Sequence, residues 1–289
     1  MPMNNTAKRL ILFVIAFPIL GALIFLLPHY HHLAANLVII LVTILSTREL
    51  TIMFIQAGFS IKSPYYPLLS GLIPLCQYLI ISDYTQEPTL TLLFVVLVSA
   101  NLIYPVFRKD KNKVVKSVST VPITIFLLVY PAYFFSYITR LSGFDQASYF
   151  LFFLVLLVYL NDSIAWFFGV LFGRNRNVFA VSPSKSREGF FGGFLASVAV
   201  SLLFIVYLPR FIDGLEPGSP VLAIIMGLVC GFTTILGDLA ESALKRYTNV
   251  KDSGDMIMGR GGLLDSVDSL LLTAPVFYYF ITLYLRMSL

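Results

Sequence analysis

Residues 147–172 read ASYFLFFLVLLVYLNDSIAWFFGVLF, a long apolar run that is interrupted by the polar pair Asn161 and Asp162. An α-helix rises 1.5 Å per residue, so about 20 apolar residues cross the roughly 30 Å hydrocarbon core of a bilayer. An ionisable side chain is costly at that depth and is a functional hypothesis by default. The run therefore predicts a membrane-spanning helix that carries part of a functional site.

The composition of the whole chain agrees with a membrane protein. Of the 289 residues, 58% are hydrophobic and 12% are charged, whereas soluble domains are about 45–50% apolar and about 25% charged. Eight further apolar runs predict spans near 10–28, 34–58, 66–82, 89–107, 119–139, 191–211, 220–243 and 266–286. Because lipid cannot satisfy backbone hydrogen bonds, each span is expected to be a helix. We therefore expect an all-α polytopic membrane protein with about nine transmembrane helices.

The basic residues predict the orientation of these helices. With a cytoplasmic N-terminus, most of the 20 lysines and arginines fall in inside loops, and only Arg140, Arg210 and Arg286 fall outside. This asymmetry follows the positive-inside rule, and it accounts for the net charge of +5 without a nucleic-acid partner. The inside loops also hold the polar motifs, so the functional site is expected to face the cytoplasm. We divide the chain into an N-terminal region of about five helices, 1–140, and a C-terminal region, 141–289, that is expected to carry the functional site.

The two cysteines favour neither a disulfide framework nor a zinc site. Cys76 and Cys230 both lie in apolar runs, far apart and without CxxC spacing. We expect both to be packing residues.

A first group of polar residues ends the 220–243 span, in the stretch GDLAESALKRYTNVKD. Three polar residues follow Asp238 at distances of three, four and seven positions, namely Glu241, Ser242 and Lys245. This spacing places all four on one helical face. Carboxylates at membrane depth face a polar cavity, a partner or an ion. The alternative is an ion pair between Glu241 and Lys245 on a solvated helix end.

A second group lies in KDSGDMIMGRGGLLDSVDS, residues 251–269. Asp265 and Asp268 share a face at the start of the last span, and Gly259, Gly261 and Gly262 precede them. Glycines at a helix start let backbone N–H groups approach a phosphate, and Mg²⁺ can join that phosphate to carboxylates. The alternative is that Asp265 only caps the helix and that the helix dipole favours Asp268.

Two further polar features lie upstream. In SPSKSREGFFGG, the side chains of Ser182, Lys185, Ser186 and Arg187 form a compact loop of donors that suits phosphate oxygens, although such a basic loop can also serve topology alone. Arg48 and Glu49 lie in the second span, as an ion pair or as part of the same cavity.

Together these motifs resemble the phosphatidate cytidylyltransferases, or CDP-diacylglycerol synthases. The C-terminal signature of that family appears here in unbroken register as Ser242, Leu244, Lys245, Arg246, Lys251, Asp252, Gly254, Ile257, Gly261, Gly262, Leu263, Asp265, Val267 and Asp268. The segments NDSIAWFFGVLFG and SPSKSREGFFGG and the carboxylate of Glu49 are also similar to family elements. The chain departs from the signature at Met258, at Arg260 in place of histidine, and at Ser266 in place of arginine.

The resemblance implies transfer of CMP from CTP to phosphatidic acid, with Mg²⁺ as cofactor and with a second cation left open. It implies metal ligands among Asp238, Asp252, Asp265 and Asp268, and catalytic roles for Lys245, Lys251, Asp252, Asp265 and Asp268. Substrate-binding positions would be Glu49, Asp162, Ser182, Lys185, Lys245, Arg246, Lys251, Arg260, Gly261 and Gly262. The expected location is a bacterial inner membrane, among membrane lipids, and a homodimer is left open.

Two other functions remain open from the sequence. A related enzyme could use CTP to modify another lipid phosphate or a polyprenol. An ion-coupled transporter would instead need polar residues along a path through the membrane, whereas the polar groups here gather on one side.

Overall fold

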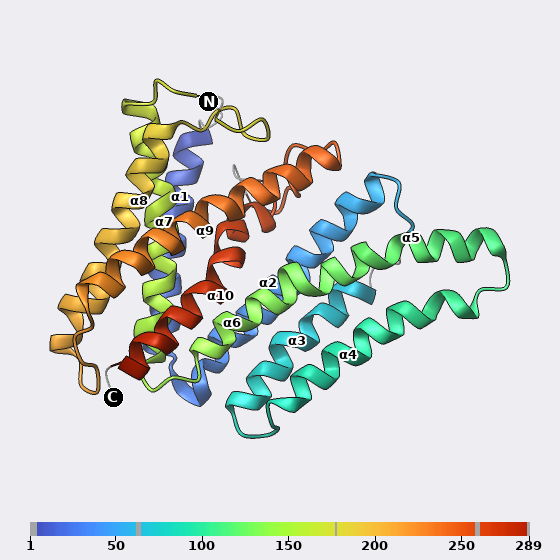
Figure 1. The fold of residues 1–289 in the computed structure, drawn as a ribbon, viewed down its shortest axis with the longest axis horizontal. Coiled ribbons are helices and arrows are strands. Elements are labelled where there is room, and N and C mark those ends of the chain that lie inside the picture. The colour runs from blue at the N-terminus through green and yellow to red at the C-terminus, as the bar shows by residue number, and fades with distance from the viewer. Residues whose placement is uncertain (1–4, 62–64, 177, 258–260, 288–289) are drawn as a thin grey trace. The chain divides into compact units, whose positions relative to one another are not determined.

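The structure is a computed structural model that describes residues 5–61, 65–176, 178–257 and 261–287, with side chains from residue 15 onward. Within these ranges the chain is helical and contains no β-strand, which confirms the all-α prediction (Figure 1). The helices are α1 (Asn5–Leu26), α2 (His29–Gln56), α3 (Tyr65–Ile81), α4 (Pro88–Ile103), α5 (Lys111–Leu127), α6 (Phe134–Leu141), α7 (Ala147–Leu171), α8 (Arg187–Leu202), α9 (Pro220–Tyr247) and α10 (Leu264–Met287). Short 3₁₀ or π segments are η1 (Tyr104–Phe107), η2 (Leu128–Tyr133), η3 (Leu203–Tyr207) and η4 (Leu208–Phe211).

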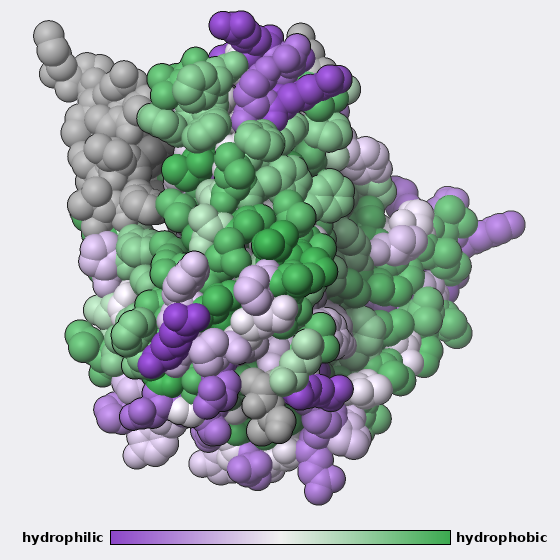
Figure 2. Space-filling model, turned by 60° about the vertical axis from the view of Figure 1, so that its left-hand side comes forward, coloured by the Kyte–Doolittle hydropathy of each residue, from purple (hydrophilic) through white to green (hydrophobic). Residues whose placement is uncertain are grey.

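Seven of the described helical stretches are long and apolar enough to cross a membrane. They are His29–Gln56, Pro88–Phe107, Lys111–Leu141, Ala147–Leu171, Arg187–Phe211, Pro220–Tyr247 and Leu264–Met287. Two shorter apolar stretches, Ile15–Leu26 and Tyr65–Ile81, lie where the other two spans are predicted. Figure 2 shows hydrophobic residues over the middle of one face, with hydrophilic residues gathered toward its ends. The protein is a multi-pass integral membrane protein.

Several helix boundaries differ from the sequence prediction, among them the start of α5 and the end of α9. The fifth predicted span begins at 119, but α5 already begins at Lys111, because the carboxylate of Asp110 accepts a hydrogen bond from Asn112 N (2.8 Å) and caps the helix. The eighth predicted span ends at 243, but α9 continues to Tyr247. This extension keeps Lys245 on the same helix as Asp238.

The chain forms two compact units. The first contains residues 1–143 and 247–266, and the second contains residues 144–246 and 267–289. Helix α10 therefore begins in the first unit and continues in the second. The prediction that residues 141–289 carry the functional site stays a prediction.

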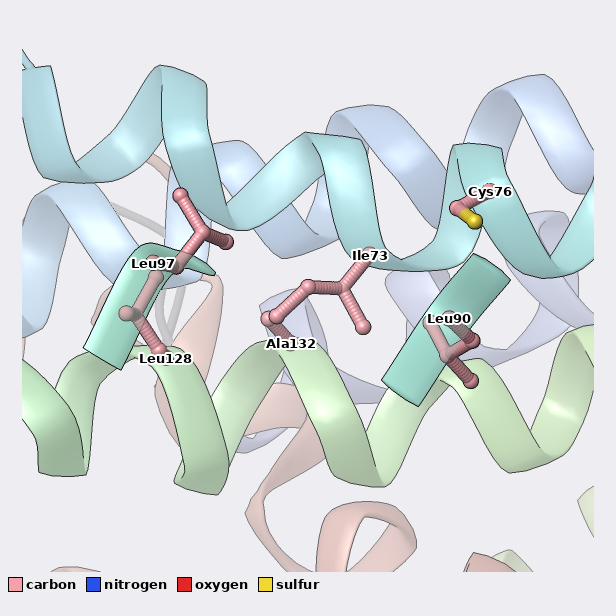
Figure 3. Close-up of a cluster of buried hydrophobic side chains, with 6 residues drawn as sticks. All are labelled: Ile73, Cys76, Leu90, Leu97, Leu128 and Ala132. Atoms are coloured by element: carbon pink, nitrogen blue, oxygen red, sulfur yellow. The ribbon is translucent and has the colours of Figure 1, made fainter. Parts of the chain in front are cut away.

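The first unit has an apolar core between α3, α4 and η2. Figure 3 shows its members, Ile73 and Cys76 from α3, Leu90 and Leu97 from α4, and Leu128 and Ala132 from η2. The π-helical turn of η2 contains Pro131, which lacks the N–H needed for a regular α-helical bond. Helix α2 packs along α3, where a Cβ on Gly71 would lie 2.8 Å from the Ile44 side chain. A small residue is thus needed at this crossing.

The second unit is centred on the close packing of α7 against α8. A Cβ on Gly192 would lie 2.5 Å from the Phe168 ring, and one on Gly193 would lie 3.0 Å from Asn161 Oδ1. The Asn161 amide donates hydrogen bonds to Gly193 O (3.0 Å) and Ser197 Oγ (2.7 Å). Asn161 therefore joins two helices in the unit.

Candidate functional site

In the first unit, Glu49 binds the start of α10. The Glu49 side chain is buried, with a relative exposure of 5%. Its carboxylate accepts hydrogen bonds from Leu263 N (2.9 Å) and Leu264 N (2.8 Å). The first N–H groups of a helix have no partner within the helix, and the helix dipole favours a negative charge beside them. Glu49 thus caps α10 from a helix more than 200 residues away in sequence.

Asp265 organises the loop that precedes α10. One oxygen, Oδ2, accepts from Ser253 N (2.9 Å), Ser253 Oγ (2.9 Å) and Gly262 N (2.7 Å). Ser253 Oγ also lies 3.0 Å from Glu49 Oε2, so this hydroxyl joins the two carboxylates. The loop is therefore held by charge-assisted hydrogen bonds, which are stronger than neutral ones.

Gly261 and Gly262, at the end of this loop, pack directly against these carboxylates. Gly261 has a φ of +108°, and a Cβ there would lie 2.6 Å from Asp265 Oδ2 and 3.0 Å from Asp252 Cβ. At Gly262, a Cβ would lie 2.5 Å from Glu49 Oε2. The sequence predicted that these glycines admit a phosphate, and that role stays a prediction. The structure adds a second reason for them, because any side chain would displace Glu49 or Asp265.

In the second unit, the loop before α8 provides a lysine to α9. Ser186 Oγ accepts from Gly189 N (3.1 Å) and caps α8, which fixes the end of the loop. Lys185 Nζ lies 2.6 Å from Asp238 Oδ2, and Asp238 Oδ1 accepts from Ser242 Oγ (3.4 Å). The predicted donor loop and the predicted carboxylate face therefore meet at this ion pair.

Asp268 adds a buried carboxylate to the same unit. Its Oδ1 accepts from Ser269 N (2.6 Å), and the charges of Asp238, Asp162 and Lys245 all act on it. Gly237 allows α9 to approach α10, because a Cβ there would lie 2.6 Å from the Asp268 carbonyl oxygen. Carboxylates that are close in a low-dielectric environment repel each other strongly. A bound cation at these carboxylates stays a prediction.

Glu241 and Lys245 form an ion pair along α9. The sequence raised this pair as an alternative on a solvated helix end. The pair is present, but the Glu241 side chain is fully buried. Lys245 thus pairs with Glu241, and its positive charge also acts on the Asp268 carboxylate.

Most of the chain matches a known protein family. The model described as "Cytidylyltransferase family" matches residues 7–284. The chain belongs to the cytidylyltransferase family. The sequence-based resemblance is thus confirmed at the level of the family.

Several curated relatives are similar to this cytidylyltransferase. A phosphatidate cytidylyltransferase of Thermotoga maritima is 35% identical over 215 residues, which are 74% of this chain and 76% of that protein. The phosphatidate cytidylyltransferase of Bacillus subtilis is 32% identical over 160 residues, 54% of this chain and 56% of that protein. The uncharacterized protein YnbB of Escherichia coli is 41% identical over 129 residues, and the aligned part spans 41% of its length.

The carboxylates of the second unit suit Mg²⁺ by their chemistry. Mg²⁺ takes oxygen ligands and is commonly bound by one or two carboxylates together with substrate phosphates. Across the described ranges, no three His, Cys, Asp or Glu side chains form a group that could hold a metal ion by themselves. Binding of Mg²⁺ therefore stays a prediction, with Asp238 and Asp268 as the candidate ligands in the second unit.

The other residues that the sequence predicts for the site lie in different kinds of surroundings. Ser182 lies in a turn where its carbonyl oxygen accepts from Lys185 N (3.3 Å). The side chains of Lys251, Asp252 and Arg246 are exposed. Arg260 and Met258 lie outside the described residues, together with Gly259. Ser266 N donates to Leu263 O (3.0 Å) in the first turn of α10, so the substituted signature position is helical.

Sequence reasoning missed Ser253 as a structural centre of the site. This serine contacts both Glu49 and Asp265, and it lies between Asp252 and Gly254 in the signature. A small hydroxyl residue between a carboxylate and a glycine is typical of a loop in which the side chain bonds the backbone. That signal was present, but it could not identify the partner on α2.

Proposed function

We propose that this cytidylyltransferase transfers CMP from CTP to phosphatidic acid, which gives CDP-diacylglycerol and pyrophosphate. The observation that carries the proposal is the alignment over 74% of the chain with a relative named phosphatidate cytidylyltransferase. The cluster of Lys185, Asp238 and Asp268 supports it, because it offers both charges that a metal-bound triphosphate needs.

The reaction requires little covalent chemistry from the protein. An oxygen of the phosphatidate headgroup attacks the α-phosphorus of CTP, and the bond to the departing pyrophosphate breaks. The acceptor oxygen is already ionised, so no serine or histidine relay is required. Catalysis of this type depends on alignment and on neutralisation of charge.

We assign complementary electrostatic roles to the second unit. Asp238 and Asp268 would hold Mg²⁺, which supplies neutralisation of the triphosphate charge when it is bound. Lys185 would release Asp238 and turn to a phosphate oxygen when the nucleotide enters, and Lys245 would remain close to Asp268. Asp162 supports the negative potential that attracts the cation.

In the first unit, the main role that we assign to Glu49 and Asp265 is to hold the loop before α10 in one conformation. Asp265 and Glu49 bind backbone groups around Gly262 and Leu264, which fixes the loop that carries Asp252. Further ligand roles for Asp252, Asp265, Lys251, Arg246, Arg260, Gly261, Gly262 and Ser182 are proposals that rest on the family resemblance. A cytoplasmic location of the site rests on the distribution of lysine and arginine. A second cation and a homodimer also stay predictions.

The test uses purified protein with radiolabelled CTP, phosphatidic acid and Mg²⁺. We expect labelled CDP-diacylglycerol from the wild type and a loss of at least about 100-fold in kcat for Asp268→Asn, because electrostatic groups of this kind contribute that order of magnitude. Asp255→Asn, an exposed carboxylate of the same polar region, is the matched control and should keep its activity. Full activity in Asp268→Asn would contradict the role of this carboxylate.

A further inference from the structure

An arginine lies exposed on a membrane-spanning helix of the first unit. Arg48 is in α2, about two turns before Gln56 and therefore roughly 12 Å from the end of the helix. A charged side chain inside a span is costly and is retained for a partner or a pathway. Its surroundings identify which of these applies.

The face of α2 that carries Arg48 is otherwise apolar. Leu41 and Ile55 lie seven residues before and after it, which places them on the same side of the helix. They are 54% and 39% exposed, and Leu37, further along this stripe, is 57% exposed. Such exposed leucine and isoleucine side chains on a spanning helix suit lipid chains. Arg48 therefore projects from a lipid-compatible face.

No acidic side chain of the described chain neutralises Arg48. The adjacent Glu49 is buried and accepts from Ser253, Leu263 and Leu264 instead. Ion pairs in the described ranges join Arg140 to Glu87, Lys185 to Asp238 and Lys245 to Glu241. None of these three ion pairs involves Arg48. The carboxylate of Glu49, its neighbour in sequence, is hydrogen-bonded to the loop before α10 instead.

A lipid phosphate is the anion that fits this position. Arginine side chains extend along apolar surface to place the guanidinium at the headgroup level. The planar guanidinium binds phosphate through two parallel hydrogen bonds, which an ammonium group cannot reproduce. Arg48 is the neighbour of Glu49 in sequence, and Glu49 holds the loop before α10 together with Asp265.

We propose that Arg48 binds the phosphate monoester headgroup of the acceptor lipid and that the exposed stripe of Leu37, Leu41 and Ile55 receives its acyl chain. The proposal rests on the proposed function and specifies how the acceptor is recognised. Arg48 is thus a substrate-binding residue for the lipid and has no role toward CTP.

The test compares Arg48→Gln and Arg48→Lys with the wild type in mixed micelles, where the surface concentration of phosphatidic acid is varied. We expect Arg48→Gln to raise the KM for phosphatidic acid by about tenfold and Arg48→Lys to raise it less, with the KM for CTP unchanged. Lys109→Gln is the matched control, because it removes an exposed cation elsewhere in the same unit. An unchanged KM for phosphatidic acid in an active, folded Arg48→Gln protein would overturn the proposal.

A binding measurement separates this inference from the proposed function. Native mass spectrometry of the detergent-solubilised protein should show retention of phosphatidic acid by the wild type, and reduced retention by Arg48→Gln and Arg48→Lys. If the wild type binds phosphatidic acid through Arg48 but forms no CDP-diacylglycerol, the proposed function fails and the inference about binding stands. Glycerol 3-phosphate tests the headgroup alone: equal competition by it would contradict the role of the apolar stripe.

Discussion

The contact between Glu49 and the start of α10 allows a quantitative test. Replacement of Glu49 by alanine removes the acceptor of Leu263 N and Leu264 N and one partner of Ser253 Oγ. Hydrogen bonds to a charged group contribute about 1.5–3 kcal/mol each, so two lost backbone bonds weaken local structure by about 3 kcal/mol or more. Since about 1.4 kcal/mol corresponds to a tenfold change, amide exchange at Leu263 and Leu264 should accelerate by roughly 100-fold.

Hydrogen–deuterium exchange measured by mass spectrometry is the assay. Glu49→Gln should have a smaller effect, about tenfold, because one acceptor oxygen remains while the charge is lost. The control is Asp255→Asn, which removes an exposed carboxylate near the loop and should leave the exchange unchanged. Equal protection of Leu263 and Leu264 in wild type and Glu49→Ala would refute the assignment of Glu49 as the cap of α10.

Two further predictions concern packing and charge within each unit. Gly262→Ala should displace Ser253 and Glu49, because a Cβ would meet Ser253 Oγ and would lie 2.5 Å from Glu49 Oε2, and should lower both activity and the melting temperature; Gly21→Ala, where no atom lies within 4 Å, should lower neither. Lys185→Gln and Asp238→Asn should show a coupling of about 0.5–1 kcal/mol in a double-mutant cycle on the free energy of unfolding, since both side chains are partly exposed and solvent screens the pair. Strict additivity of the two changes would show that the ion pair contributes nothing in solution.

Hydropathy is sufficient to predict most of this fold. An apolar run such as 147–172 can satisfy its backbone in lipid only as a helix, so both the class and the approximate positions of the spans follow from composition. Helix ends are harder to predict, because they depend on single side-chain contacts. The Asp110 carboxylate begins α5 eight positions earlier than hydropathy suggested, at Lys111 instead of 119.

The candidate site shows a similar contrast between local and distant contacts. The spacing of Asp238, Glu241 and Lys245 predicts a common helical face, and α9 provides that face because the residues are close in sequence. The bonds of Glu49 to Ser253 and Leu264 join positions more than 200 residues apart, and no local pattern encodes such a pairing. The same limit applies to Gly262, whose need for a small residue depends on where the Glu49 carboxylate lies.

In the proposed reaction, an oxygen of phosphatidic acid attacks the α-phosphorus of CTP. Phosphatidic acid labelled with ¹⁸O in its phosphate group, incubated with the purified protein, CTP and Mg²⁺, tests that step directly by mass spectrometry of both products. We predict that CDP-diacylglycerol retains the full label of the phosphate and that pyrophosphate contains none. Absence of CDP-diacylglycerol, or the appearance of ¹⁸O in pyrophosphate, would contradict the proposed transfer.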